Sequence, residues 1–67
     1  MNFNKSLKAH RLKANLKQKD IAEQIGISLR GYQQYEQGKY EPDIAKLIKL
    51  ANLFKISLDE LVGRKFP

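Results

Sequence analysis

The chain has 67 residues, a formal net charge of +6 and no cysteine. This length allows one domain over residues 1–67, with a core so small that it needs efficient helix packing or a partner chain. The lack of thiols excludes disulfides and cysteine metal sites, which suits a reducing cytosol. No apolar run approaches the roughly 20 residues that a membrane span needs, and the amphipathic N-terminal segment does not resemble a signal peptide.

Positive charge gathers in the N-terminal part of the sequence. Residues 1–19 hold six Lys and Arg and no acid, whereas residues 40–67 hold five against four acids. A solubilising surface and an electrostatic footprint for phosphate groups both fit this excess. Charge alone does not separate the two.

Helical patterns dominate the first half of the chain. Apolar spacings of three and four predict a first helix over about residues 4–14, followed by Asn15 as a left-handed cap. A short second helix is expected over residues 18–25, ended by Gly26. Ser28 is a good N-cap for a third helix over residues 29–37, which Gly38 ends.

Two further helices are expected in the second half. Asp43 caps a fourth helix, whose apolar face we expect to consist of Ile44, Leu47, Ile48, Ala51 and Phe54. Ser57 and Glu60 have the spacing of a capping box and begin a short fifth helix with Leu58, Leu61 and Val62. The sequence therefore predicts an all-α, compact five-helix bundle.

The second and third helices are joined in the manner of a helix-turn-helix. The joint Ile25-Gly26-Ile27-Ser28 is short and contains a glycine that can adopt a positive φ. Ala22 is small enough for the third helix to cross close to the second. We therefore expect these two helices to form a rigid pair.

The third helix has two distinct sides. At about 100° per residue, Tyr32, Tyr35 and Glu36 share the side that faces the core. The opposite arc holds residues that can read base edges in duplex DNA, since Arg suits guanine, Gln suits adenine and Leu suits the thymine methyl: Leu29, Arg30, Gln33, Gln34 and Gln37. Gly31 borders this arc, either to allow a close approach of the backbone or as a tolerated weak point.

Three spaced motifs make the chain similar to a known family. They are Gln18-x-x-Ile21-Ala22-x-x-Ile25-Gly26-Ile27-Ser28, then Tyr35-Glu36-x-Gly38-Lys39-x-x-Pro42, then Leu47-x-x-Leu50-Ala51-x-x-Phe54-x-Ile56-Ser57-x-Asp59-Glu60-Leu61. Over about residues 7–62 the chain resembles the phage repressor and Cro family of helix-turn-helix proteins (the xenobiotic-response-element type). The resemblance implies a five-helix fold, a third helix in the DNA major groove and binding as a symmetric homodimer.

The resemblance also assigns roles to positions. Leu29, Arg30, Gln33 and Gln34 would face bases, with Gln37 on the same arc. Phosphates would be contacted by residues that flank the second and third helices: Gln18, Lys17, Ser28, Lys39 and Tyr40. Arg11 and Glu36 match a structural pair that ties the first helix to the third, with a phosphate contact as the second interpretation of Arg11.

Several positions depart from the family pattern. Lys17 stands where a capping Ser or Thr is usual, so it either is a solvated lysine or adds a phosphate contact. Lys55 replaces a usual glycine after the fourth helix, which predicts strain in that turn. Tyr32 and His10 replace usual aliphatic residues, and we interpret His10 as a partly buried core histidine.

The predicted function is sequence-specific binding of double-stranded DNA by a transcriptional regulator, with repression as the expected outcome. The operator would be palindromic, with the two recognition helices of a dimer about 34–36 Å apart. Leu58, Val62 and Phe66 are candidates for the dimer interface, and ordinary packing within the chain is the alternative. We expect a cytoplasmic protein of bacterial or phage origin that is associated with the nucleoid.

Other functions fit the same sequence. One alternative is a DNA-binding antitoxin that autoregulates its operon together with a toxin partner. Another is a protein-interaction module on the same fold, although the acid-free outer arc of the third helix argues against it. With one histidine, no cysteine and no glycine-rich phosphate loop, we expect no enzyme, no cofactor and no metal site.

Overall fold

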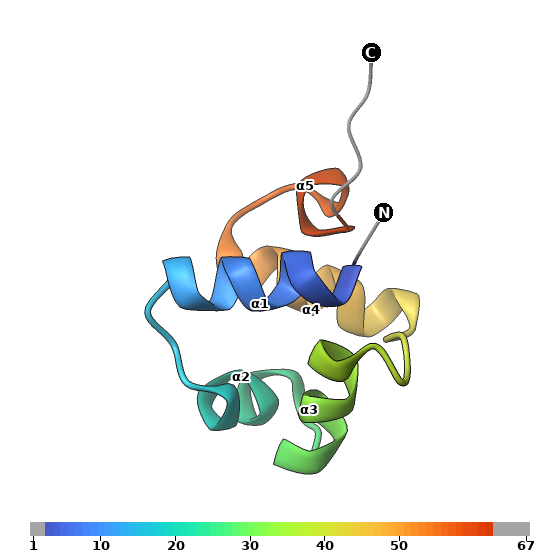
Figure 1. Ribbon diagram of the computed structural model, residues 1–67. Helices are drawn as coiled ribbons and strands as arrows, with labels where there is room; N and C mark the ends of the chain where they lie inside the picture. Colours follow the sequence, from blue (N-terminus) through green and yellow to red (C-terminus); the bar gives the residue numbers. More distant parts are fainter. Residues whose placement is uncertain (1–2, 63–67) are drawn as a thin grey trace.

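The computed structural model describes residues 3–62. These residues form five helices and no strand, in the order α1 (Phe3–Lys13), α2 (Gln18–Ile25), α3 (Leu29–Gln37), α4 (Ile44–Phe54) and α5 (Leu58–Val62) (Figure 1). The predicted all-α fold class is confirmed. The first helix ends one residue earlier than the sequence pattern suggested, because the chain turns through Asn15, whose φ is +60°.

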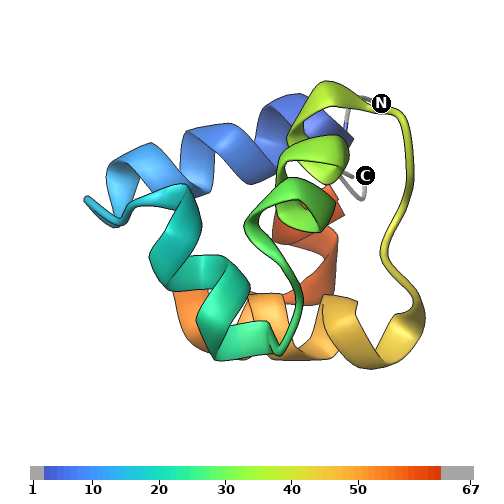
Figure 2. The same cartoon turned by 90° about the horizontal axis from the view of Figure 1, so that it is seen from below.

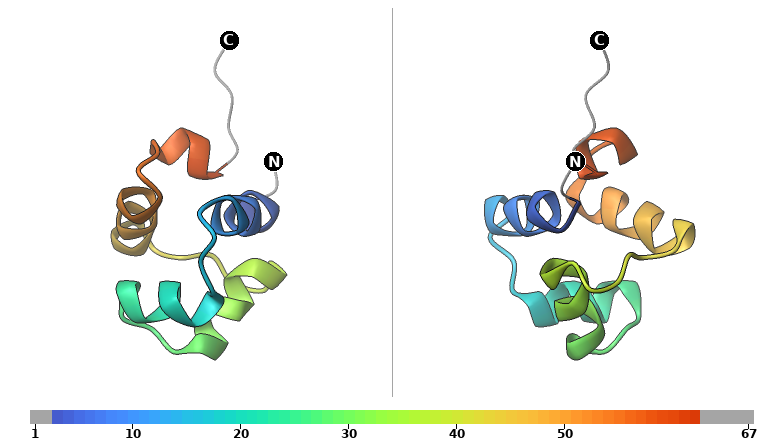
Figure 3. Two further views of the ribbon diagram at one scale, coloured as in Figure 1. Left: turned by 90° about the vertical axis from the view of Figure 1, so that its left-hand side faces the viewer. Right: turned by 45° about the vertical axis from the view of Figure 1, so that its right-hand side comes forward.

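Two layers make up the molecule. Helices α1, α4 and α5 form the upper part in Figure 1, and the α2–α3 pair lies beneath α1 and α4. Figure 3 shows α5 bridging α1 and α4 on the side away from α2 and α3. The packing contacts agree, since α5 packs against α1 and α4, while α3 packs against α1 and α2.

The core lies where the five helices meet. Leu7, Ile21, Tyr32, Leu50 and Leu61 are the largest side chains that are fully buried, and each comes from a different helix. Burying one large apolar side chain contributes about 1.5–3 kcal/mol. Every helix is therefore held to the others by at least one residue of the central cluster.

The apolar face of α4 differs from the one expected. Ile44 and Ile48 are 71% and 44% exposed, whereas Leu50 and Ala51 are buried. The expectation for the two isoleucines was wrong because the apolar stripe of α4 is wider than the surface that α2 and α5 cover. Two large apolar side chains are left on the outside of this helix.

The helix ends follow local chemistry. Ser28 Oγ accepts the Gly31 N–H (3.0 Å) and Asp43 Oδ1 accepts the Lys46 N–H (2.9 Å). Ser57 Oγ accepts the Glu60 N–H at 3.1 Å. These bonds satisfy backbone donors that the first turn of a helix leaves free.

The turn after α4 lacks the usual glycine. Lys55 adopts φ +57° and ψ +44°, a left-handed conformation, and the Ile56 N–H closes the helix by donating to Ala51 O at 3.0 Å. A side chain in this region is strained by the contact of Cβ with the carbonyl oxygen. The predicted strain at Lys55 therefore has a geometric basis.

Candidate nucleic-acid interface

The joint between α2 and α3 is a tight turn. Gly26 has φ +78° and ψ +32°, and the Ile27 N–H donates to Ala22 O at 3.0 Å to close α2. Ser28 then begins α3 through its side-chain cap. Figure 2, seen from below, shows α2 and α3 side by side at this surface, joined by the short turn. The arrangement is that of a helix-turn-helix.

The inner face of α3 is aromatic and buried. Tyr32 has no exposed surface, and the half-buried Tyr35 packs against the core cluster. Their rings meet edge to face with centroids 6.4 Å apart. This geometry suits the charge distribution of aromatic rings. It also fixes the rotation of α3 about its axis, and so decides which residues face outward.

One carboxylate organises the space between α1, α2 and α3. Arg11 Nε donates to Glu36 Oε2 at 2.6 Å, and Arg11 Nη2 donates to Oε1 at 3.2 Å. The two side chains are only 12% and 5% exposed. The Tyr32 hydroxyl donates to Oε2, and Gln18 Nε2 donates to Oε1 at 3.1 Å. Glu36 thus accepts four hydrogen bonds, and we call these four residues the Glu36 cluster.

The Glu36 cluster keeps its carboxylate charged. Burial raises the pKa of Glu36, but hydrogen bonds from Arg11, Tyr32 and Gln18 outweigh it and hold the pKa below its usual value. The hydrogen bond to Glu36 raises the pKa of Arg11. Burial, with help from the same carboxylate, raises the pKa of the Tyr32 hydroxyl far above its ordinary value. At neutral pH the cluster is therefore an ion pair with a neutral phenol.

Gln18 also reaches the outer face of α3. Its Oε1 accepts a hydrogen bond from Gln33 Nε2 at 3.2 Å. Gln18 stands at the first position of α2 and is half-buried. From the sequence, Gln18 was expected to contact a phosphate only. Nothing in the sequence pattern indicates that Gln18 joins two other side chains.

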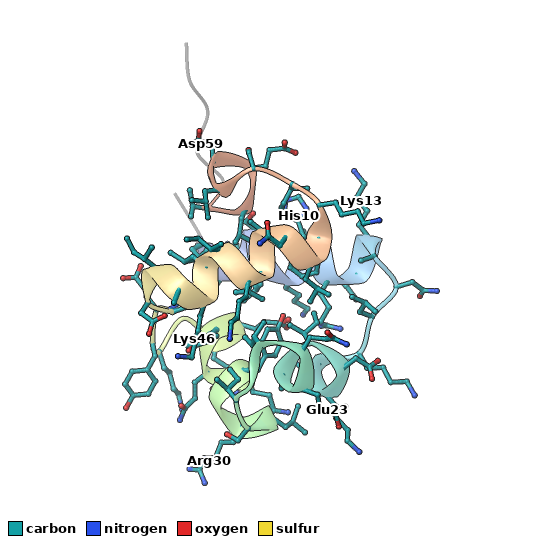
Figure 4. All side chains as sticks on the ribbon, turned by 180° about the vertical axis from the view of Figure 1, so that it is seen from behind. His10, Lys13, Glu23, Arg30, Lys46 and Asp59 are labelled. Atoms are coloured by element: carbon teal, nitrogen blue, oxygen red, sulfur yellow. The ribbon has the colours of Figure 1, made fainter. Side chains whose placement is uncertain are left out.

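The outer arc of α3 forms a polar surface. Arg30 and Gln37 are exposed, Gln33 and Gln34 are half-buried, and Leu29 is 41% exposed. Figure 4 shows the labelled Arg30 side chain pointing away from the body of the molecule. A surface hollow is lined by five side chains without a carboxylate: Arg30, Gln33, Gln34, Gln37 and Lys39. Four of the five predicted base-contacting residues therefore line one hollow, and Leu29 is not part of its lining.

The predicted phosphate-contacting residues lie at or next to the ends of α2 and α3. Lys17, Ser28 and Lys39 are exposed, and Tyr40 is 61% exposed. Lys39 and Tyr40 line a second hollow at the C-terminal end of α3, which also contains the carboxylate of Glu41. Lys17 lies directly before α2, as its N-cap residue.

Lys17 has no side-chain acceptor for the first turn of α2, but Asp20 binds back to the start of the helix. The backbone N–H of Lys17 donates to Asp20 Oδ2 at 3.3 Å. A carboxylate at this position also interacts favourably with the helix dipole. Asp20 was not among the predicted capping residues, although its spacing of three residues from Lys17 is that of a capping box.

Gly31 has a structural reason that the sequence did not reveal. A Cβ at this position would lie 3.2 Å from Ser28 Oγ, the oxygen that caps α3. Its own N–H is the donor to that oxygen. Glycine therefore leaves the cap undisturbed.

The three candidates for a dimer interface are placed differently. Leu58 is 44% exposed, and Val62 is half-buried and lines a mostly apolar hollow with Phe3, Glu41, Pro42 and Leu47. Leu61 is fully buried within the chain. Phe66 lies outside the described residues.

The remaining expectations concern His10, metal ligands and membrane-spanning helices. His10 is half-buried, its ring centroid lies 6.1 Å from that of Phe54, and its Nε2 is 3.2 Å from Glu60 O. Within residues 3–62, no group of three or more potential metal ligands is found. Over the same residues, no helix has the length and apolar character to cross a membrane.

Comparison with known proteins identifies the family. A helix-turn-helix family model matches residues 7–61. The phage transcriptional repressor RstR of Vibrio cholerae is 41% identical over 64 residues, which are 96% of this chain and 57% of that protein. The transcriptional regulator ImmR of Bacillus subtilis is 39% identical over 96% of this chain and 50% of its own length.

A solved structure shares the fold. A transcriptional regulator from Listeria innocua matches with a TM-score of 0.89 and 38% identity, over 97% of this chain and 61% of that one. The chain spans about half the length of the curated relatives it matches. The matched residues 7–61 include α2, the turn and α3, together with Arg11 of the Glu36 cluster. The chain belongs to the phage-repressor and Cro type of helix-turn-helix family, whose members include transcriptional regulators.

Proposed function

We propose that this protein is a sequence-specific, double-stranded DNA-binding regulator of transcription that inserts α3 into the major groove. The observation that carries the proposal is the division of α3 into a fixed inner face and an outer arc of one guanidinium, three amides and one leucine. A major groove offers acceptors on guanine, a donor and an acceptor on adenine, and a methyl group on thymine. The arc can bind each of these, and it places no carboxylate against the phosphates.

Contacts to the DNA backbone would hold α3 in register within the major groove. Lys39 and Tyr40 lie past the C-terminal end of α3, while Lys17 and Gln18 lie at the start of α2. The N-terminus of α2 presents free N–H groups and the positive end of a helix dipole, which suits a phosphate. Contacts on both sides of a groove position a recognition helix without reading sequence.

A symmetric homodimer on a palindromic operator is part of the proposal. Helices α4 and α5 pack against each other, and both carry exposed apolar side chains, Ile44, Ile48 and Leu58 among them. Burying these side chains against a second copy would remove apolar surface from water and would add to a small core. Sedimentation in the presence and absence of a selected duplex would measure the stoichiometry.

Repression is the regulatory outcome we favour. The support comes from RstR, which is named as a phage transcriptional repressor and is similar to almost the whole of this chain. A reporter placed behind a selected operator would test it. Expression should fall when the protein is supplied, and a rise would mean activation.

Selection of bound duplexes from a random pool is the decisive experiment for DNA binding. We expect one enriched motif with two-fold symmetry and an affinity that falls steeply with salt. Recovery of no preferred sequence, with weak binding that salt does not change, would contradict the proposal. That second result would instead favour a protein-interaction module.

A further inference from the structure

A chain of hydrogen bonds links the buried carboxylate to the outer arc of α3. Gln18 Nε2 donates to Glu36 Oε1 at 3.1 Å, and Gln18 Oε1 accepts from Gln33 Nε2 at 3.2 Å. Gln33 is one of the side chains that line the hollow on the arc. One end of this series of hydrogen bonds therefore lies in the protein interior, and the other lies where a base edge would be read.

The donor and the acceptor in each of these hydrogen bonds follow from the chemistry of the groups. An ionised carboxylate can only accept hydrogen bonds, so Gln18 must turn its NH₂ group toward Glu36. The carbonyl oxygen of Gln18 is then left for Gln33. Because a carbonyl oxygen can only accept, Gln33 must in turn direct its own NH₂ group at Gln18. An unrestrained glutamine amide can rotate by half a turn and exchange its donor and acceptor, and Gln33 loses this freedom.

We propose that Gln18 is a positioning residue that fixes the amide of Gln33 with its oxygen toward the base, so that Gln33 selects adenine and rejects guanine. The inference rests on the proposed function. Gln33 keeps a free Oε1 and one free N–H, which match the N6 donor and N7 acceptor of adenine. Guanine presents O6 and N7, both acceptors, and O6 would face the fixed oxygen of Gln33.

The neighbouring side chains of the arc provide a comparison. No hydrogen bond ties the side chain of Gln34 to another residue in the range 3–62, so its amide is free to turn either way. Arg30 has donors only and suits guanine. The fixed polarity is therefore a property of Gln33, and it comes from a residue on a different helix.

Two substitutions of Gln18 separate the alternatives. Gln18→Met keeps the volume but removes both hydrogen bonds, so Gln33 becomes free to turn. Gln18→Lys keeps a donor for Glu36 but offers no acceptor, so Gln33 should turn its oxygen toward the lysine and its NH₂ group outward. The added charge of the lysine strengthens binding to all duplexes alike, so it does not change a ratio between two bases.

The test measures affinity for matched duplexes that differ at one base pair. Gln33→Ala first identifies the base pair whose identity Gln33 reads, and Gln34→Ala serves as the control that should affect a different one. At that pair, the wild type should prefer adenine over guanine by about tenfold or more. The ratio should fall below about threefold in Gln18→Met and should favour guanine in Gln18→Lys.

Each other outcome overturns the inference. An unchanged ratio in both Gln18 variants, or a wild type that prefers guanine, would reject it while leaving DNA recognition intact. If Gln33→Ala alters no base preference, Gln33 does not read a base. If no duplex sequence is preferred at all, the proposed function fails together with the inference.

A second measurement needs no substitution and no DNA. In the free wild-type protein, one side-chain amide hydrogen of Gln33 should exchange slowly with water, because it is bonded to Gln18. Both side-chain amide hydrogens of Gln34 should exchange at the rate of a free amide. Equal rates for the two glutamines would contradict the fixed amide, even if the Gln18 variants did not fold.

Discussion

The two faces of α3 differ in how firmly their side chains are held. On the inner face, Tyr32 and Glu36 are bound to α1 and α2 by hydrogen bonds and burial. On the outer arc, the side chains of Arg30, Gln34 and Gln37 make no hydrogen bond to another residue among those described. One helix of nine residues therefore combines a fixed anchor with groups that remain free to bind a partner.

This division explains how a chain of 67 residues can hold a recognition helix rigidly. Isolated helices of this length are unstable in water, so α3 depends on its tertiary contacts. Each outward side chain of α3 lies within one helical turn of Tyr32 or Glu36, the two residues that hold the inner face. Substitutions on the inner face should therefore change folding stability, and substitutions on the outer arc should change binding alone.

The largest effect should come from Glu36→Ala. The change removes the acceptor of four hydrogen bonds and leaves the mostly buried charge of Arg11 unpaired, so we expect a loss of about 3–5 kcal/mol in the free energy of unfolding. Denaturant unfolding measures it. Lys46→Ala is the control, since it breaks the exposed ion pair with Asp43 and should leave the melting temperature close to that of the wild type.

Acid should remove the contribution of the same carboxylate. The pKa of Glu36 is lower in the folded protein than the value of about 4.3 expected in the unfolded chain. Its stabilisation is therefore complete above the unfolded value and is lost as the pH falls through the folded pKa. The difference in unfolding free energy between the wild type and Glu36→Gln should shrink as the pH falls from 5. A difference independent of pH would contradict the role of the charged carboxylate.

On the outer arc, substitution should affect binding without affecting the fold. Arg30→Ala or Gln34→Ala should cost about 1–3 kcal/mol of affinity for the preferred duplex and relax the choice of base at one position. Lys39→Ala should weaken binding to all duplexes alike and reduce the salt slope by about 1. Equal, sequence-independent losses from all three variants would argue against direct readout by α3.

The two tyrosines of the inner face differ in their hydrogen bonding. Tyr32→Phe removes a hydrogen bond to a buried carboxylate and should cost about 1–2 kcal/mol of stability. Tyr35→Phe is the matched control, because the Tyr35 hydroxyl has no hydrogen-bond partner among the described residues, and it should cost much less. Similar losses from both variants, measured by thermal unfolding, would show that the bond to Glu36 is unimportant.

The smallest expected effect lies away from α3. Lys55→Gly should stabilise the protein by about 0.5–1 kcal/mol, because glycine adopts the left-handed conformation without strain. Asn15→Gly is the control and should stabilise the protein less, since Asn tolerates the same conformation better than Lys. A destabilised Lys55→Gly variant would mean that the turn after α4 carries no strain.

The sequence predicted the helices well because their signals are local. Ser28, Asp43 and Ser57 cap the helices they precede, and the bounds of α2 and α3 agree with the expected ranges. The division of α3 followed from its residue spacing alone, since rotation by 100° per residue separates Tyr32 from Gln34. These features depend on residues within a few positions of one another.

Features that depend on how helices are placed could not be predicted. The hydrogen bonds that join Gln18 to Glu36 and to Gln33 connect residues that are 18 and 15 positions apart. The exposure of Ile44 and Ile48 depends on how much of α4 its neighbours cover. In both cases the sequence supplies the right residue types, but the contacts arise only when separate helices meet.

Titration of isotope-labelled protein with a selected duplex, followed residue by residue by NMR, would show which face of α3 contacts DNA. We predict large shifts for the backbone and side-chain signals of Arg30, Gln33 and Gln34, with little change for Tyr32 and Leu50. If duplex binding leaves the signals of these three outward residues unshifted, α3 does not contact DNA through its outer arc.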